Sequence, residues 1–231
     1  MPETSIKKTE YRYFTMKKIC ALVSGLLLAA TVFAQEITTA NDFFSQVSNY
    51  YATFEDYEAD VDITIGKSEM NGRLSFKRPG MFRIDFETPA EQCINFDGDT
   101  LKIYLPGYSA ILEQSVSGTT QGVTGLALIK RYYTIAYETG QAPVPLEDGS
   151  DEMVINLICN LRSSTEAFRS ILISVDPVSK LIVRVTAVPV QGDTYVLDFS
   201  NYKMNTHMGE SRFIYDPPSS ANNYNNFLFE E

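Results

Sequence analysis

The segment FKRPGMFRIDFETP, Phe76 to Pro89, is the stretch that decides the fold. Apolar and polar side chains alternate on both sides of a bend, and the apolar ones are Phe76, Phe82, Ile84 and Phe86. A period of two is typical of a β-strand that buries one face. The bend contains a basic pair, Lys77-Arg78, followed by Pro79-Gly80, which is a turn signal. The segment therefore predicts two antiparallel strands joined by a basic turn.

The same alternation extends in both directions from this hairpin. About six strand-like pieces follow one another between Tyr57 and Val116, and we interpret Asn71-Gly72 and Asp97-Gly98 as turns. Residues 133–137 alternate as a further strand, and four more strand patterns lie between residues 152 and 202. The last residues, 221–231, we expect to be a loose tail. Ten or eleven consecutive antiparallel strands must curl or close.

Two segments have helical spacing instead. Apolar residues recur every three or four positions between Thr38 and Phe54, and Thr38 or Thr39 can cap the start of this helix. A shorter apolar helix is predicted over residues 122–131. The predicted fold is α+β and mainly β: an incomplete antiparallel β-barrel of about ten or eleven strands, with the helices as a lid over its concave face.

The N-terminus is typical of a secretory signal peptide. Lys17 and Lys18 precede the apolar run Ile19–Ala30, and small residues lead up to Ala34. The run is too short for a membrane-spanning helix of about 20 residues. We therefore expect Met16 to be the true start and cleavage to follow Ala34, which leaves residues 35–231 as a single exported domain.

The charge of the chain excludes some partners. The formal net charge is −10, and removal of residues 1–34 takes away five basic and two acidic residues and leaves −13. Nucleic-acid binding and attraction to anionic membrane surfaces both need a basic surface, so neither is expected. Cys20 precedes the apolar run, so it is no lipidation site. Cys93 and Cys159 either form a disulfide or are two buried thiols, and we favour the thiols.

Motifs for chemistry are missing from the sequence. His207 is the single histidine, no serine lies in a G-x-S-x-G motif, and no cysteine–histidine cluster has zinc spacing. We therefore expect no enzyme, no catalytic residue, no metal and no cofactor. A curved sheet with an apolar concave face either binds an apolar ligand or simply holds a core, and alternation alone does not distinguish the two.

Two blocks of the sequence carry a family resemblance. The block GRLSFKRPGMFRIDFETPAEQCINFDGDTLKIYLP, residues 72–106, resembles the signature of the periplasmic outer-membrane lipoprotein carrier family, LolA. The shared features are Lys77-Arg78-Pro79, the Asp97-Gly98 hairpin and the strand Leu101–Pro106. The segment FSNYKMNTHMGESRFIYDPP, residues 199–218, resembles the end of the family's sequences.

This resemblance implies a fold, a function and a site. The implied protein is a soluble, periplasmic and monomeric chaperone, whose hydrophobic cavity shields the acyl chains of lipoproteins between the inner and the outer membrane. The implied partners are acylated lipoproteins, an inner-membrane ATP-driven release complex and an outer-membrane receptor. The resemblance gives Arg78 the role of a latch on the helical lid. The candidate residues that line the cavity are Phe43, Val47, Leu74, Phe76, Phe82, Ile84, Phe86, Ile103, Leu126 and Ile129.

Two alternatives remain open at this point. The same fold could bind or sense a lipid or glycolipid, although a sensor would need a second domain for which the chain has little room. A hydrolase with an apolar pocket is the third possibility, and it lacks a nucleophile motif.

Overall fold

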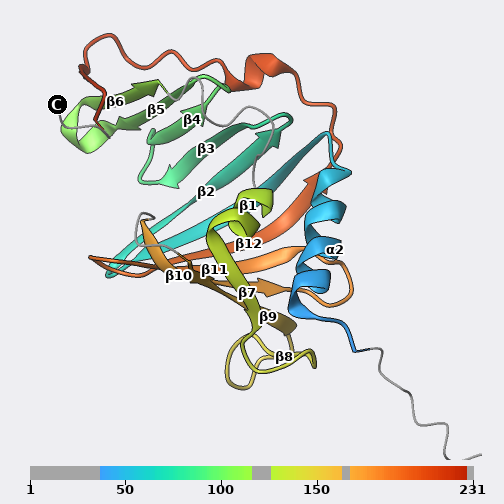
Figure 1. Ribbon diagram of the computed structural model, residues 1–231. Coiled ribbons are helices and arrows are strands. Elements are labelled where there is room, and N and C mark those ends of the chain that lie inside the picture. The colour runs from blue at the N-terminus through green and yellow to red at the C-terminus, as the bar shows by residue number, and fades with distance from the viewer. Residues whose placement is uncertain (1–36, 116–125, 163–166, 228–231) are drawn as a thin grey trace, which may run out of the picture. The chain divides into compact units, whose positions relative to one another are not determined.

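The computed structural model describes residues 37–115, 126–162 and 167–227 (Figure 1). Residues 38–231 form one compact unit. The predictions of a signal peptide, of a start at Met16 and of cleavage after Ala34 lie outside the described residues, as does the first part of the helix expected over residues 122–131.

The strands make one open sheet, in the order β13-β6-β5-β4-β3-β2-β1-β12-β11-β10-β9-β7, with β8 paired to β9. All described strand pairs are antiparallel except β13 with β6. The prediction of an unclosed antiparallel sheet with few helices is confirmed. The strands are β1 (Asp56–Ile65), β2 (Ser68–Lys77), β3 (Met81–Thr88), β4 (Cys93–Phe96), β5 (Thr100–Leu105), β6 (Ala110–Ser115), β7 (Tyr133–Tyr137), β8 (Val144–Pro145), β9 (Met153–Leu161), β10 (Phe168–Val175), β11 (Ile182–Pro189), β12 (Tyr195–Met204) and β13 (Asn222–Asn225).

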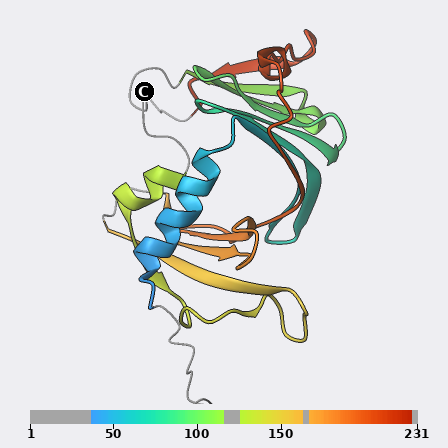
Figure 2. The same cartoon turned by 90° about the vertical axis from the view of Figure 1, so that its right-hand side faces the viewer.

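Within the described residues, two α-helices and two short 3-10 helices accompany the sheet. They are α2 (Ala40–Ala52), α3 (Leu126–Tyr132), η1 (Pro106–Tyr108) and η2 (Glu210–Phe213). Figure 2 shows that the sheet curves and that α2 and α3 lie on the inner side of the curve. We call this side the inner face and the opposite side the outer face.

Helix α2 forms where the spacing predicted it, and Thr39 caps it. The backbone N–H of Asp42 donates to Thr39 Oγ1 (3.1 Å), and the Thr39 hydroxyl donates to the Asp42 carboxylate (2.7 Å). An acidic residue in the first turn also suits the positive end of the helix dipole. The buried side of α2 carries Phe43, Phe44 and Val47, which pack on β7, β9, β10 and β11.

The expected turn at Asn71-Gly72 is wrong, because both residues lie inside β2. The hairpin between β1 and β2 turns instead at Gly66, whose φ of +60° lies in the left-handed region. At Gly72 the pairing with β3 shifts by one residue, and a Cβ there would lie 2.3 Å from the Asp85 carbonyl oxygen. The glycine therefore permits a close approach of two strands at a bulge and does not mark a turn.

The sheet contains two strands more than the upper estimate of eleven. Residues 222–225 were expected in a loose tail, but they form β13 beside β6. The Asn222 N–H donates to the Ser109 carbonyl (2.7 Å), and the Asn226 N–H donates to the Glu113 carbonyl (2.8 Å). All four residues of this strand are exposed and three of them are asparagines, and β8 has only two residues, so neither has the alternation that reveals a strand in sequence.

The two described cysteines are buried free thiols, as favoured above. Cys93 lies on β4 and Cys159 on β9, and six strands separate β4 from β9 in the sheet. Burial raises the pKa of Cys93 to about 11 and the pKa of Cys159 to about 12. Both thiols therefore stay protonated and act as small apolar side chains.

Candidate functional site

The inner face of β2 to β6 carries two rows of apolar side chains, one of which ends at the buried Gln114 opposite Leu101. Register places Leu74 opposite Ile84 and Phe76 opposite Phe82. The rows continue across β4, β5 and β6, because strand pairing keeps side chains of equal parity on one face. We call this surface the β2–β6 apolar face, and its residues are Leu74, Phe76, Phe82, Ile84, Ile94, Phe96, Leu101, Ile103 and Leu112. Each of the nine side chains is only partly buried.

The inner face at the other end of the sheet is closed by α2. Phe43 and Val47 retain only 4% and 1% of their surface, and they pack with Ile155, Leu157 and Ile173 of the strands beneath. We call the buried cluster that α2 forms with these strands the α2-covered core, and Phe44 and Ile182 also belong to it. The side chains of Leu126 and Ile129, on α3, pack against it.

The residues expected to line a cavity thus fall into two groups. Phe43, Val47, Leu126 and Ile129 belong to or pack against the α2-covered core. Leu74, Phe76, Phe82, Ile84 and Ile103 belong to the β2–β6 apolar face. The tenth, Phe86, is a buried neighbour of that face and packs with Val61 and Ile63 of β1.

Arg78 connects the end of β2 to the end of α2. Its Nε–H donates to the carbonyl oxygen of Phe54 (2.7 Å), and its Nη2–H donates to that of Tyr51 (3.3 Å). Its backbone N–H donates to the Glu55 carbonyl (3.0 Å). Tyr51 lies in the last turn of α2, and Phe54 follows the C-cap residue Thr53. A helix carries the negative end of its dipole there, so a guanidinium suits this position.

An aromatic cluster lies beneath this end of α2. The rings of Tyr51, Phe54 and Tyr57 contact one another edge to face, and Tyr57 stacks on Phe76 at 5.0 Å between ring centroids. Tyr202, on β12, contacts Tyr57 as well. Sequence reasoning did not assign these tyrosines a role. The available signal was a tyrosine on the inward side of a helix (Tyr51) or of a strand (Tyr57 and Tyr202), where a buried hydroxyl needs a partner.

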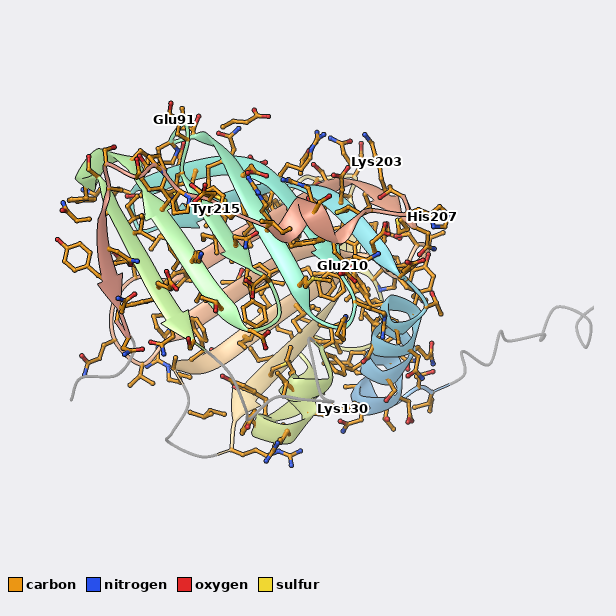
Figure 3. All side chains as sticks on the ribbon, turned by 90° about the horizontal axis from the view of Figure 1, so that it is seen from above. Glu91, Lys130, Lys203, His207, Glu210 and Tyr215 are labelled. Atoms are coloured by element: carbon orange, nitrogen blue, oxygen red, sulfur yellow. The ribbon has the colours of Figure 1, made fainter. Side chains whose placement is uncertain are left out.

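The first half of α2 is held by different groups. The Tyr137 hydroxyl donates to the Thr38 carbonyl (3.0 Å), and the Thr38 N–H donates to the side chain of Gln141 (3.1 Å). Lys130 donates to the Ser45 hydroxyl and its ammonium lies over the Phe44 ring, so α3 is linked to α2 (Figure 3). Polar contacts therefore hold α2 near both of its ends.

A polar pocket of about 300 Å³ lies elsewhere, under the loop that joins β8 to β9. Arg184 pairs there with Asp198 and with Glu147 (2.9 Å). The residues that line the pocket are Asp62, Leu146, Glu147, Ser150, Glu152, Val183, Arg184, Asp198, Phe199 and Ser200. Four carboxylates make it unsuitable for an acyl chain. Among the described residues no group of three or more histidine, cysteine or acidic side chains could hold a metal ion.

The outer face is covered in part by the C-terminal segment. Arg212, on η2, pairs with Asp85 and donates to Ser75 (3.2 Å), and the Asn95 amide donates to the Phe213 carbonyl (2.8 Å). Figure 3 shows Tyr215 over the same strands, and the guanidinium of Arg83 lies 5.0 Å from its ring centroid. These contacts hold the segment that resembles the family's ending against β2, β3 and β4.

His207 lies in the segment after β12 and is exposed, with its Nδ1 3.7 Å from a Glu55 carboxylate oxygen. Its position gives it no serine or cysteine partner among the side-chain hydrogen bonds of the described residues. No helix in the described part of the chain has the length and hydropathy needed to cross a membrane.

Comparison with known protein families matches residues 45–216 to the family described as "Outer membrane lipoprotein carrier protein LolA". The match covers most of the chain, from the middle of α2 into the C-terminal segment on the outer face. The chain belongs to the LolA family. A relative named "Outer-membrane lipoprotein carrier protein" from Methylibium petroleiphilum is 26% identical over 200 residues, which are 87% of this chain and 94% of the relative.

Other relatives match a smaller part of the LolA-family chain. The protein of the same name from Yersinia pestis is 29% identical over 106 residues, 46% of this chain and 50% of that protein. Among solved structures, an uncharacterized conserved protein from Thermus thermophilus is similar with a TM-score of 0.52. It is 14% identical, and the match covers 81% of this chain and 99% of that one, so the similarity concerns the fold alone.

Proposed function

We propose that this protein is a periplasmic carrier that shields the acyl chains of lipoproteins and transfers them from the inner to the outer membrane. Family membership and the names of its relatives support a lipoprotein carrier. The observation that carries the proposal is the β2–β6 apolar face, nine partly buried apolar side chains in two rows beside a helix held by polar bonds.

An acyl chain exposed to water carries a large free-energy cost, which a carrier removes. Each CH₂ moved out of water contributes about 0.8 kcal/mol, so one chain of about 16 carbons costs on the order of 12 kcal/mol in water. A carrier must therefore cover the chains, yet release them at the destination. A lid that competes for the same apolar surface satisfies both requirements.

In this proposal α2 is the lid and Arg78 its latch. Acyl chains first occupy the β2–β6 apolar face and then displace α2 from the α2-covered core, which exposes Phe43 and Val47 to them. The two Arg78 bonds to carbonyls at the end of α2 oppose this step. Charge-assisted hydrogen bonds of this kind contribute roughly 1.5–3 kcal/mol. The closed lid is then the state to which the protein returns on release.

The proposed partners follow from the transfer of lipoproteins between the inner and the outer membrane. Cargo would come from an ATP-driven release complex in the inner membrane and pass to a receptor in the outer membrane. The cargo itself would be recognised by its acyl chains, because the described inner face offers apolar side chains to its ligand.

A binding experiment with a matched pair of variants tests the proposal. Ile103 and Lys102 are neighbours on β5 that point to opposite faces, since Ile103 pairs with Ile94 and Lys102 with Asn95. The purified protein is mixed with a diacylated lipopeptide or with the same peptide without acyl chains. We expect binding of the acylated form only, a loss of at least tenfold in Ile103→Glu, and little change in Lys102→Glu.

Native mass spectrometry of protein isolated from its own periplasm gives an independent answer. A co-purifying lipoprotein supports the carrier. A free lipid or glycolipid in its place, with no affinity for acylated peptide, would replace the carrier with a lipid-binding or lipid-sensing module.

A further inference from the structure

The last turn of α2 is held by hydrogen bonds to strands on either side of β1. Arg78 follows β2 and holds it from one side. Tyr51 holds it from the other side, through Tyr202 on β12 and the backbone of Ile182 on β11. In the sheet order β2-β1-β12-β11, strand β1 separates these two attachments.

The second attachment is a closed ring of three hydrogen bonds. The Ile182 N–H donates to the Tyr51 hydroxyl (2.9 Å), the Tyr51 hydroxyl donates to that of Tyr202 (3.2 Å), and the Tyr202 hydroxyl donates to the Ile182 carbonyl (2.8 Å). Each hydroxyl gives one bond and receives one. Hydrogen bonds in such a chain polarise one another.

The surroundings of this ring are apolar. Phe54 and Tyr57 contact the Tyr51 ring, and Ile182 belongs to the α2-covered core. Burial raises the pKa of Tyr51 above its ordinary value, although the hydrogen bonds with Tyr202 and Ile182 oppose this rise. A hydroxyl that loses its partner in such a place keeps the full cost of its removal from water.

We propose that the Tyr51–Tyr202–Ile182 ring is a second latch on α2, independent of Arg78, and that it must break when α2 leaves the sheet. It ties α2 to β11 and β12, beside the α2-covered core, whereas Arg78 ties α2 to the side of the β2–β6 apolar face. The role as a gate for acyl chains rests on the proposed function. The inference that the ring holds α2 on the sheet does not depend on the proposed function.

The geometry also predicts how the two latches combine. Loss of Arg78 frees the last turn of α2 from β2 but leaves it bound to β11 and β12. The two attachments share Tyr51, through its carbonyl in one case and its hydroxyl in the other. Only the loss of both leaves the Tyr51 side chain and carbonyl without a hydrogen bond to the described strands, while the ring contact of Tyr51 with Tyr57 on β1 remains.

Hydrogen–deuterium exchange of the purified protein, without any ligand, tests whether the ring holds α2 on the sheet. Tyr51→Phe removes the hydroxyl and keeps the ring. One net hydrogen bond corresponds to about a 3- to 10-fold change in an opening equilibrium. We expect backbone amides of α2 to exchange about 3- to 10-fold faster, while those of β2 to β4 keep their rates.

Tyr50→Phe is the matched control. Tyr50 lies in the same turn and its ring contacts Phe54 at 4.9 Å, but among the described residues its hydroxyl has no hydrogen bond. Its replacement should leave the exchange of α2 unchanged. Tyr202→Phe should resemble Tyr51→Phe, and the double variant should exchange less fast than two independent effects would give, because both remove the same ring.

Two results would overturn the second latch. Unchanged exchange of α2 in Tyr51→Phe would show that the ring does not hold the helix. Equal acceleration in every strand would show an ordinary contribution to global stability. A third measurement separates the latch from the proposed function: Tyr51→Phe should take up the diacylated lipopeptide faster than the unaltered protein. If α2 loosens but no acylated peptide binds to either protein, the latch stands and the carrier proposal fails.

Discussion

The two ends of the inner face differ in cover and not in composition. The α2-covered core and the β2–β6 apolar face both consist of alternating aliphatic and aromatic side chains on consecutive strands. In the first, α2 packs on the strands so closely that its own Phe44 and Val47 are only 1% exposed and that Leu157 beneath it is fully buried. In the second, all nine side chains stay partly exposed. An apolar surface is therefore part of the core where a helix covers it and a candidate binding site where nothing described covers it. This difference in cover can be tested by substitution.

The largest effect is expected in the α2-covered core. Phe44→Ala removes a fully buried ring and should lower the free energy of unfolding by about 3–5 kcal/mol. Phe82→Ala, on the β2–β6 apolar face, should cost less than half as much, because part of its ring is already in water. Urea unfolding followed by circular dichroism measures both. Equal losses would mean that the two ends of the inner face do not differ in cover.

Arg78 tests the boundary between the two regions. We expect Arg78→Leu to accept an acylated lipoprotein but to fail to pass it on, since a lid without its latch no longer competes for the cavity. Each of its bonds, to the carbonyls of Tyr51 and Phe54, contributes roughly 1.5–3 kcal/mol to the closed state. A transfer assay from loaded carrier to outer-membrane vesicles measures this. Unchanged transfer would remove the latch role from Arg78.

Gly72 tests whether the β2–β6 apolar face depends on its bulge. In Gly72→Ala the new Cβ would collide with the backbone of Asp85 and Phe86, so we expect a loss of about 1–3 kcal/mol in stability. Gly107→Ala is the control, because nothing lies within 4 Å of a Cβ there. Thermal unfolding compares them, and a stable Gly72→Ala protein would argue against the close approach of β2 and β3.

The smallest effect concerns pH. Asp56, where α2 leads into β1, is buried, and burial alone would raise its pKa. Hydrogen bonds from Met208 N–H and from the Thr206 hydroxyl and N–H outweigh burial and hold the pKa below its usual range. Its contribution to stability is thus present above the unfolded pKa of about 3.9 and is lost as pH falls through the lower folded value.

Urea titrations between pH 6 and pH 3 measure this loss. Asp56→Asn should be less stable at pH 6 and should show a shallower decline in acid. An identical acid dependence in the two proteins would mean that Asp56 is not among the groups responsible.

Much of the fold was predictable from local pattern. Alternation in Phe76–Phe86 specified strands and their shared face, and the spacing of Phe43, Phe44 and Val47 specified the buried side of α2. These signals are visible because side chains repeat every two or every 3.6 residues. Gly72 shows the limit of such reading, since the same Asn-Gly pair suits a turn or a bulge and only the neighbouring strand decides. The polar strand β13 has no pattern of its own.

The candidate site divides in the same way. The sequence by itself determined that this chain has an apolar inner face, a helix to lie on it and a basic turn at Arg78. The tertiary structure alone decided which half α2 covers, that Arg78 reaches the carbonyls of Phe54 and Tyr51, and that Tyr51 meets Tyr202 across 151 positions of sequence. The reason is that the order of strands in the sheet decides which side chains α2 covers and which distant segments form hydrogen bonds. The pattern of a single segment carries no information about that order.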